Sequence, residues 1–95
     1  MVAYMVFTRE RTRDPAELDT YSQKVSTSMM GHPITARAFY GRQEVLEGAA
    51  VEGVVILEFS TFEEAKAWYD SPAYRTVREH RYKGADYRAV IVQGV

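Results

Sequence analysis

Histidine is the side chain that most often acts as a general acid or base near neutral pH, and this chain has two, His32 and His80. His80 is predicted at the edge of the apolar face of the last helix, close in sequence to Tyr69. From there its imidazole could enter a pocket between helices and sheet and act as a base, while Tyr69 or Tyr40 positions a substrate oxygen. The alternative is a half-buried histidine that packs between two helices, or a group placed favourably near a helix C-terminus.

Two further polar residues are candidates for ligand binding. His32 lies in a Gly-His-Pro turn, where it is either an ordinary loop residue or a residue at the mouth of the same pocket. Arg37 lies in the middle of an apolar strand segment and could bind a ligand carboxylate or phenolate. It could equally pair with Glu58 or Glu44 on a neighbouring strand, and we favour that ion pair.

Aromatic residues are numerous for so short a chain, and they suggest an aromatic cavity with several hydroxyl groups. Such a cavity would suit a planar, oxygenated small molecule, with Trp68 and Tyr40 in its wall. The alternative is packing in the core and in a dimer interface, because a buried tyrosine needs only one partner for its hydroxyl group. The aromatic set comprises Tyr4, Tyr21, Phe39, Tyr40, Phe59, Trp68, Tyr69, Tyr74 and Tyr82.

Composition excludes several classes of function. The chain has 95 residues, which is the length of one domain, and a net charge of -1. No basic stripe accompanies the aromatic residues, so neither nucleic acid nor an anionic membrane is expected as a partner. The mixed charges around Arg9–Arg11 and Arg75–Arg81 are interpreted as solvated faces. No apolar run approaches the roughly 20 residues of a membrane span, and no signal peptide is recognised, so we expect a cytoplasmic protein.

Motifs for metals and cofactors are absent. The chain has no cysteine and no H-E-x-x-H motif, so no metal site is expected. It has no G-x-G-x-x-G motif and no phosphate-binding loop, so no cofactor is expected. The serines lie in predicted helices or at their caps rather than in a nucleophile elbow.

The order of predicted elements is strand, helix, strand, strand, split helix, strand. Asp14-Pro15 begins the first helix and Gly31 ends it, while a capping box at Ser60…Glu63 or Thr61…Glu64 begins the second. This order predicts a single ferredoxin-like domain with a four-stranded antiparallel sheet and helices on one face. The predicted strands are 3–10, 34–40 (with 44–46 as a continuation), 54–59 and 86–93, and the predicted helices are 15–30, about 62–70 and 72–84.

Both faces of the predicted sheet are apolar. In the third strand, Val55 and Leu57 alternate with Val54 and Ile56, and only Glu58 interrupts the second set. An antiparallel sheet that meets water on one side normally carries polar residues there. We therefore expect a second copy of the chain to cover the helix-free face, giving a homodimer.

Five segments carry a distinctive combination of residues: Val45–Gly48, Val54–Phe59, Ala67–Tyr74, Arg78–Arg81 and Ala89–Val92. Together they resemble a bacterial family, the domain of unknown function 1330. The resemblance covers nearly the whole chain and is strongest over 45–92. It implies a dimeric α+β barrel in which two sheets face each other. The wider superfamily includes cofactor-free monooxygenases, muconolactone-type isomerases and polyketide cyclases, so the resemblance implies a fold and a dimer but no particular reaction.

Three hypotheses of function follow. The first is a cofactor-free enzyme of the isomerase, cyclase or monooxygenase type that acts on a small aromatic or oxygenated metabolite, with His80 as base. The second is a module that binds or senses a small molecule without turnover. The third is a homodimer with a structural role only.

Overall fold

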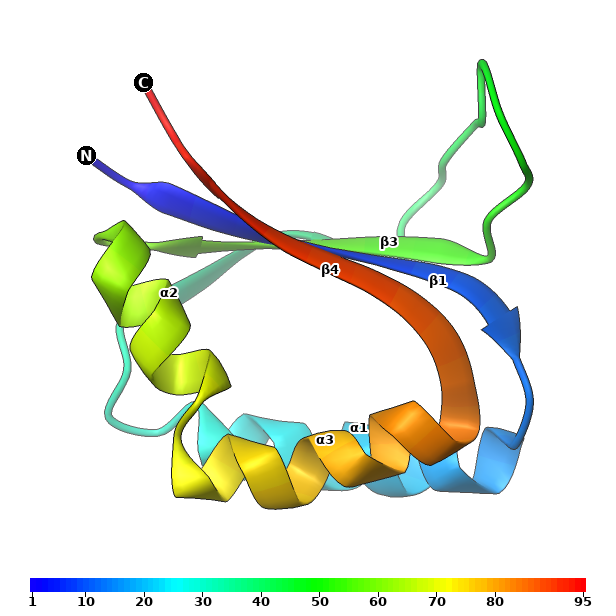
Figure 1. Ribbon diagram of the computed structural model, residues 1–95, viewed down its shortest axis with the longest axis horizontal. Helices are drawn as coiled ribbons and strands as arrows, with labels where there is room; N and C mark the ends of the chain where they lie inside the picture. The colour runs from blue at the N-terminus through cyan, green and yellow to red at the C-terminus, as the bar shows by residue number, and fades with distance from the viewer.

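The computed structural model describes all 95 residues and has the predicted ferredoxin-like order (Figure 1). Its single sheet is antiparallel with the strand order β2-β3-β1-β4. The predicted split of the second helix is confirmed. The elements are β1 (Ala3–Thr12), α1 (Pro15–Ser28), β2 (Ile34–Phe39), β3 (Gly53–Phe59), α2 (Phe62–Tyr69), α3 (Pro72–Gly84) and β4 (Ala85–Gln93).

The helices begin where short polar side chains cap them. The Asp14 carboxylate accepts a hydrogen bond from Ala16 N at 3.1 Å, and Pro15 follows at the first helical position. Of the two predicted caps of α2, the one at Thr61 forms its N-cap bond, in which Thr61 Oγ1 accepts a hydrogen bond from Glu64 N at 3.0 Å. Ser71 caps α3, and its hydroxyl also donates to Trp68 O at 2.8 Å, which joins the ends of α2 and α3.

The core lies between the sheet and the helices. Residues at alternate positions of β1 and β3 point toward the helices and are buried, as the period of two for a strand requires. Trp68, Tyr74 and Val77 come from the helices to meet them. The sheet members of this core are Met5, Phe7, Val55, Leu57 and Phe59.

A β-bulge in β2 changes which of its residues face the helices. Ala36 lies opposite Leu57, but Ala38 lies opposite Ile56 and Phe39 opposite Val55, so the extra residue is Arg37. Directly opposed residues share a face. The bulge therefore turns Phe39 toward the helices, whereas an unbroken strand would have turned it away. The predicted continuation of this strand through 44–46 is wrong, because those residues have no partner in the sheet.

The other face of the sheet carries no helix (Figure 1). Val90 and Val92 are 54% and 50% exposed there, and Val6 lies opposite both Ile56 and Val90 in the sheet. The loop 41–52 rises on this same side (Figure 1). None of the helices is long and apolar enough to cross a membrane.

Gly84, the last residue of α3, lies directly against α1. A Cβ atom on Gly84 would lie 2.7 Å from Leu18 Cδ2 and 3.1 Å from the Leu18 backbone nitrogen, so no larger residue fits without a shift. The Gly84 carbonyl oxygen also accepts hydrogen bonds from Arg13 N and Asp14 N, at 2.8 and 2.9 Å. The start of α1 is therefore fixed to the end of α3.

Candidate functional site

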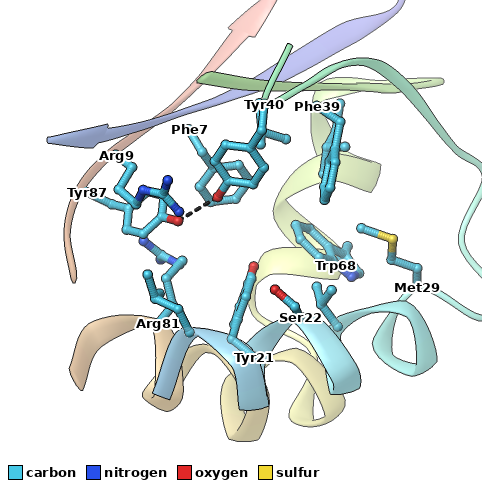
Figure 2. A pocket seen from close by; sticks show the side chains of 14 residues that line it. Phe7, Arg9, Tyr21, Ser22, Met29, Phe39, Tyr40, Trp68, Arg81 and Tyr87 are labelled. Carbon is cyan, nitrogen blue, oxygen red and sulfur yellow. Dashed lines mark hydrogen bonds between the residues drawn. The ribbon is translucent and has the colours of Figure 1, made fainter. Parts of the chain in front are cut away.

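A small cavity lies between the inner face of the sheet and α1 (Figure 2). Its volume is about 60 Å³, which is room for a few water molecules or a very small ligand. Most of the 14 lining residues are aliphatic or aromatic, and the exceptions are Arg9, Ser22 and Arg81. Residues from β1, β3, β4 and all three helices line it, together with Phe39 and Tyr40 at the end of β2.

Arg81 is a buried cation in the wall of this cavity. The residue is only 4% exposed, and its Nε atom has no hydrogen-bond partner. None of the ion pairs in the structure includes it. Its guanidinium carbon lies 5.0 to 5.2 Å from the ring centres of Phe7, Tyr82 and Tyr87, so aromatic faces partly replace the lost water.

Trp68 supplies a second hydrogen-bond donor without an acceptor. The residue is fully buried and lines the cavity, yet its indole Nε1 has no partner. Its ring contacts Tyr74, at a centre-to-centre distance of 4.0 Å, and Phe59 at 5.7 Å. Packing therefore fixes the indole in place and leaves its N–H group without a partner.

Two pairs of tyrosine hydroxyls lie at the cavity. Tyr40 and Tyr87 are 2.5 Å apart between hydroxyl oxygens (Figure 2), and Tyr21 and Tyr74 are 2.7 Å apart. Burial raises the pKa of Tyr21, Tyr40 and Tyr74 above the ordinary value, and the neighbouring tyrosine of each pair raises it further for Tyr21 and Tyr40. These phenols are therefore neutral at physiological pH and act as hydrogen-bond donors and acceptors rather than as bases.

Tyr40 reaches the cavity through an uncommon backbone conformation. Its φ is 54°, in the left-handed region that non-glycine residues seldom adopt. A hydrogen bond from Tyr40 N to Val54 O, 3.0 Å long, holds it there. A Cβ atom on Gly53 would lie 2.4 Å from Tyr40 Cδ1, so a glycine at position 53 is what lets the ring lie against β3.

The raised tyrosine pKa values predict lower stability at alkaline pH. An unfolded tyrosine loses its proton near pH 10, whereas Tyr21, Tyr40 and Tyr74 keep theirs to higher pH. Their stabilising effect is therefore complete below about pH 10 and is lost as the pH rises through the folded-state pKa, by up to about 1.4 kcal/mol per pH unit for each residue. Urea unfolding between about pH 8 and pH 11 measures this decline, and Tyr21→Phe should make it shallower. A constant free energy of unfolding over that range would contradict the prediction.

The structure separates the residues that the sequence grouped around one pocket. Trp68 and Tyr40 line the cavity, as expected. His80 lines no cavity, because its ring turns away to α1, where Nδ1 lies 2.6 Å from Glu17 Oε2. Tyr69 lies in an open groove beside β4, with its hydroxyl 3.1 Å from that of Tyr82. The expected grouping of His80 and Tyr69 with Trp68 in one pocket is therefore wrong.

Two other candidates do not line the cavity. Arg37 forms the favoured ion pair, with its Nε 3.1 Å from Glu58 Oε1, on the helix-free face of the sheet. Glu58 raises the pKa of the Arg37 guanidinium through this hydrogen bond. His32 lies in the turn after α1, half-buried, and lines none of the cavities.

Sequence reasoning missed the most unusual residue of the site. Arg81 was expected on a solvated face with its charged neighbours, but it is buried. The available signal was its position beside Val77 and Tyr74 on the helical wheel, at the border of the apolar face. No group of three or more histidine, aspartate or glutamate side chains lies close enough together to hold a metal ion.

Solved structures with the same fold come from several bacteria. One is a protein of unknown function from Rhodopseudomonas palustris, 17% identical, with a TM-score of 0.74 and coverage of 99% of this chain and 82% of that one. A dimeric ferredoxin-like protein of unknown function from Jannaschia sp. CCS1 is 10% identical, with a TM-score of 0.71 and coverage of 99% and 100%. SnoaB, a cofactor-independent oxygenase from Streptomyces nogalater, is 9% identical, with a TM-score of 0.70 and coverage of 99% and 93%.

At these identities the likeness concerns the fold alone. No curated protein matches the chain. The sequence model of one family, described as "Domain of unknown function (DUF1330)", matches residues 2–95. Because that match spans almost the whole chain, the protein belongs to the DUF1330 family, as the sequence resemblance implied.

Proposed function

We propose that this protein binds a small oxygenated metabolite in the cavity between the sheet and α1. The observation that carries the proposal is the indole N–H of Trp68, a buried donor without an acceptor on a residue that lines the cavity. A buried donor without a partner costs about 1–3 kcal/mol, and an oxygen atom of a ligand would remove that cost. The hydroxyl groups of Tyr21 and Tyr40 add further hydrogen-bonding capacity to the same wall.

A cofactor-free enzyme of the isomerase, cyclase or monooxygenase type is the second candidate. SnoaB, which has the same fold, is described as a cofactor-independent oxygenase. His80 as a base gains no support from the geometry, because its imidazole binds Glu17 outside the cavity. An enzyme built on this cavity would instead polarise a substrate oxygen with the donors around Trp68 and Arg81, and would act on a substrate that ionises easily by itself.

Trp68 is the only tryptophan in the chain, so its fluorescence is a direct reporter of the cavity. We expect a change in its emission, and a higher melting temperature, on titration with compounds from a panel of phenol, catechol, acetate and acetoacetate. Stabilisation by a ligand follows from its binding to the folded state only. If no compound of the panel or of a broader metabolite library alters either signal, the proposal fails.

The matched control is His80→Asn, which removes the imidazole ring without touching the cavity. We expect it to leave ligand affinity unchanged and to lower the free energy of unfolding by no more than about 1 kcal/mol, because its partly exposed pair with Glu17 is a weak contributor. A large loss of affinity in this variant would restore the histidine hypothesis. Consumption of a bound compound, followed by mass spectrometry and an oxygen electrode, separates an enzyme from a binding module.

A homodimer formed through the helix-free face of the sheet is the arrangement that we propose for the whole protein. Val6, Ile56, Val90 and Val92 make that face apolar, and exposed apolar patches of this kind mark protein contacts. The related Jannaschia structure is described as dimeric. The cavity lies on the opposite side of the sheet, so dimerisation leaves it free for a ligand.

A further inference from the structure

We infer that the ligand of this cavity is a small organic anion, a carboxylate or an ionised enol or phenol, and that Arg81 is its counter-ion. The inference rests on the proposed function and names its ligand class. A guanidinium is always charged in proteins, and its planar N–H groups suit the two oxygens of a carboxylate. The structure places one such group in the wall of a cavity without any carboxylate to neutralise it.

The contrast with the other arginines shows how unusual this residue is. Six arginines pair with aspartate or glutamate, and all six have a more exposed side chain, from 17% to 78%. Arg81 is the only buried arginine. It is also the only charged residue among the buried side chains, and its charge is not compensated. A charge taken out of water is costly unless it is paired. The six paired residues are Arg9, Arg11, Arg13, Arg37, Arg78 and Arg88.

The groups that face Arg81 do not supply the missing negative charge. The rings of Phe7, Tyr82 and Tyr87 offer only their π faces. Tyr21 and Tyr74 are neutral phenols that share a hydrogen bond, and Tyr74 also hydrogen-bonds the Arg81 side chain, but neither phenol supplies a charge. Aromatic faces partly stabilise a cation, but they leave Arg81 Nε without an acceptor. A bound anion would provide both the acceptor and the charge.

The rest of the wall also favours an anion over a neutral or cationic ligand. Trp68 Nε1 is a second buried donor without an acceptor, and an indole N–H can only donate. Arg9 adds a further cation 4.9 Å from the Tyr40 ring, although Glu52 lies 3.2 Å from its Nε and offsets it. No carboxylate lines the cavity. Its volume of about 60 Å³ limits the buried part of the ligand to a few atoms unless Phe39 and Tyr40 move.

The test compares anions with neutral compounds of the same shape. Acetate is paired with acetamide, benzoate with benzamide, and 4-nitrophenol, whose absorbance reports its ionisation, with 4-nitroanisole. Binding is measured by Trp68 fluorescence and by ligand-observed NMR. We expect the wild type to bind at least one anion roughly tenfold or more tightly than its neutral analogue, since charge-assisted hydrogen bonds are about twice as strong as neutral ones. Acetate and benzoate test whether the ligand is a carboxylate, and 4-nitrophenol tests whether it is an ionised phenol.

Arg81→Met removes the charge and keeps an apolar stem of similar shape. We expect it to abolish the preference for the anion, whereas Arg81→Lys keeps part of it. The control is Arg78→Met, the same substitution one helical turn earlier on α3, where Arg78 pairs with Asp70 rather than lining the cavity. We expect the control to keep the full preference.

The outcomes separate this inference from the proposed function. One outcome is that neutral analogues bind as tightly as anions, with both affinities unchanged in Arg81→Met. In that case the protein binds a ligand but Arg81 is not its counter-ion. If no compound of either kind binds, both the inference and the proposed function fail. Should Arg81→Met not fold, the ratio of anion to neutral affinity in the wild type and in Arg81→Lys still decides, since equal affinities would overturn the inference.

Discussion

Replacing Trp68 with alanine lowers the free energy of unfolding by about 3–5 kcal/mol. The side chain is fully buried, and its ring packs against Phe7, Phe59 and Tyr74 at centre-to-centre distances of 6.5, 5.7 and 4.0 Å. Alanine would leave a void beside a cavity that already exists, and surrounding aromatic rings cannot collapse into it. A domain of this size has a total stability of about 5–14 kcal/mol, so the loss is a large fraction of the whole. Urea unfolding followed by circular dichroism measures it.

Trp68→Phe is the matched variant for this prediction. Phenylalanine keeps an aromatic ring in contact with Tyr74 and removes the indole N–H group, so the cost should fall to less than half of the alanine value. If Trp68→Ala costs less than about 1 kcal/mol, the packing of α2 onto the sheet does not depend on this residue and our description of the core is wrong.

Ile56→Glu converts the proposed homodimer to a monomer. Ile56 lies in the centre of the helix-free face, opposite Val6 on one neighbouring strand and Ala38 on the other. A carboxylate buried there without a partner costs at least about 3 kcal/mol, and two-fold symmetry applies the cost twice. The dissociation constant should therefore rise on the order of 10⁴-fold. Light scattering and sedimentation at micromolar concentration measure the change.

The control for charge is Met30→Glu, which adds the same carboxylate at a residue that is 76% exposed just after α1. We expect this variant to remain dimeric. A wild-type protein that is monomeric at micromolar concentration would contradict the proposed assembly, and so would an Ile56→Glu variant that remains dimeric.

Where local rules decide the structure, the sequence was sufficient to predict it. Val55, Leu57 and Phe59 are buried and alternate with more exposed residues, which follows from the period of a strand. Asp14 and Thr61 cap helices as their side-chain chemistry requires. The bulge at Arg37 was not predictable, because a bulge is one unpaired residue and leaves no mark in composition. That single residue decides that Phe39 lines the cavity.

The candidate site was predicted only in part for a similar reason. Trp68 and Tyr40 were found because large aromatic residues concentrate at cavities and cores. For α3 the helical wheel placed His80 on one side of Val77 and Arg81 on the other, and nothing in the wheel says which side faces the sheet. The packing of α3 against α1 turns His80 toward Glu17 and Arg81 toward Phe7. A charged residue at the border of an apolar face is more often solvated, which is why Arg81 was misplaced.

The contact at Gly84 has a consequence for how this cavity could change between related proteins. Arg81 precedes Gly84 by three residues, and the hydrogen bonds from Arg13 and Asp14 hold Gly84 against the start of α1. Each residue of an α-helix turns its neighbour by about 100°. One residue inserted between Arg81 and Gly84 would therefore rotate the guanidinium out of the cavity, and it would rotate the core residues Tyr74 and Val77 of the same helix by the same angle. The rotation of α3 that places Arg81 in the cavity is thus the same rotation that builds the core. A relative can therefore exchange an anionic ligand for a neutral one by substituting Arg81, but not by lengthening the helix at this point.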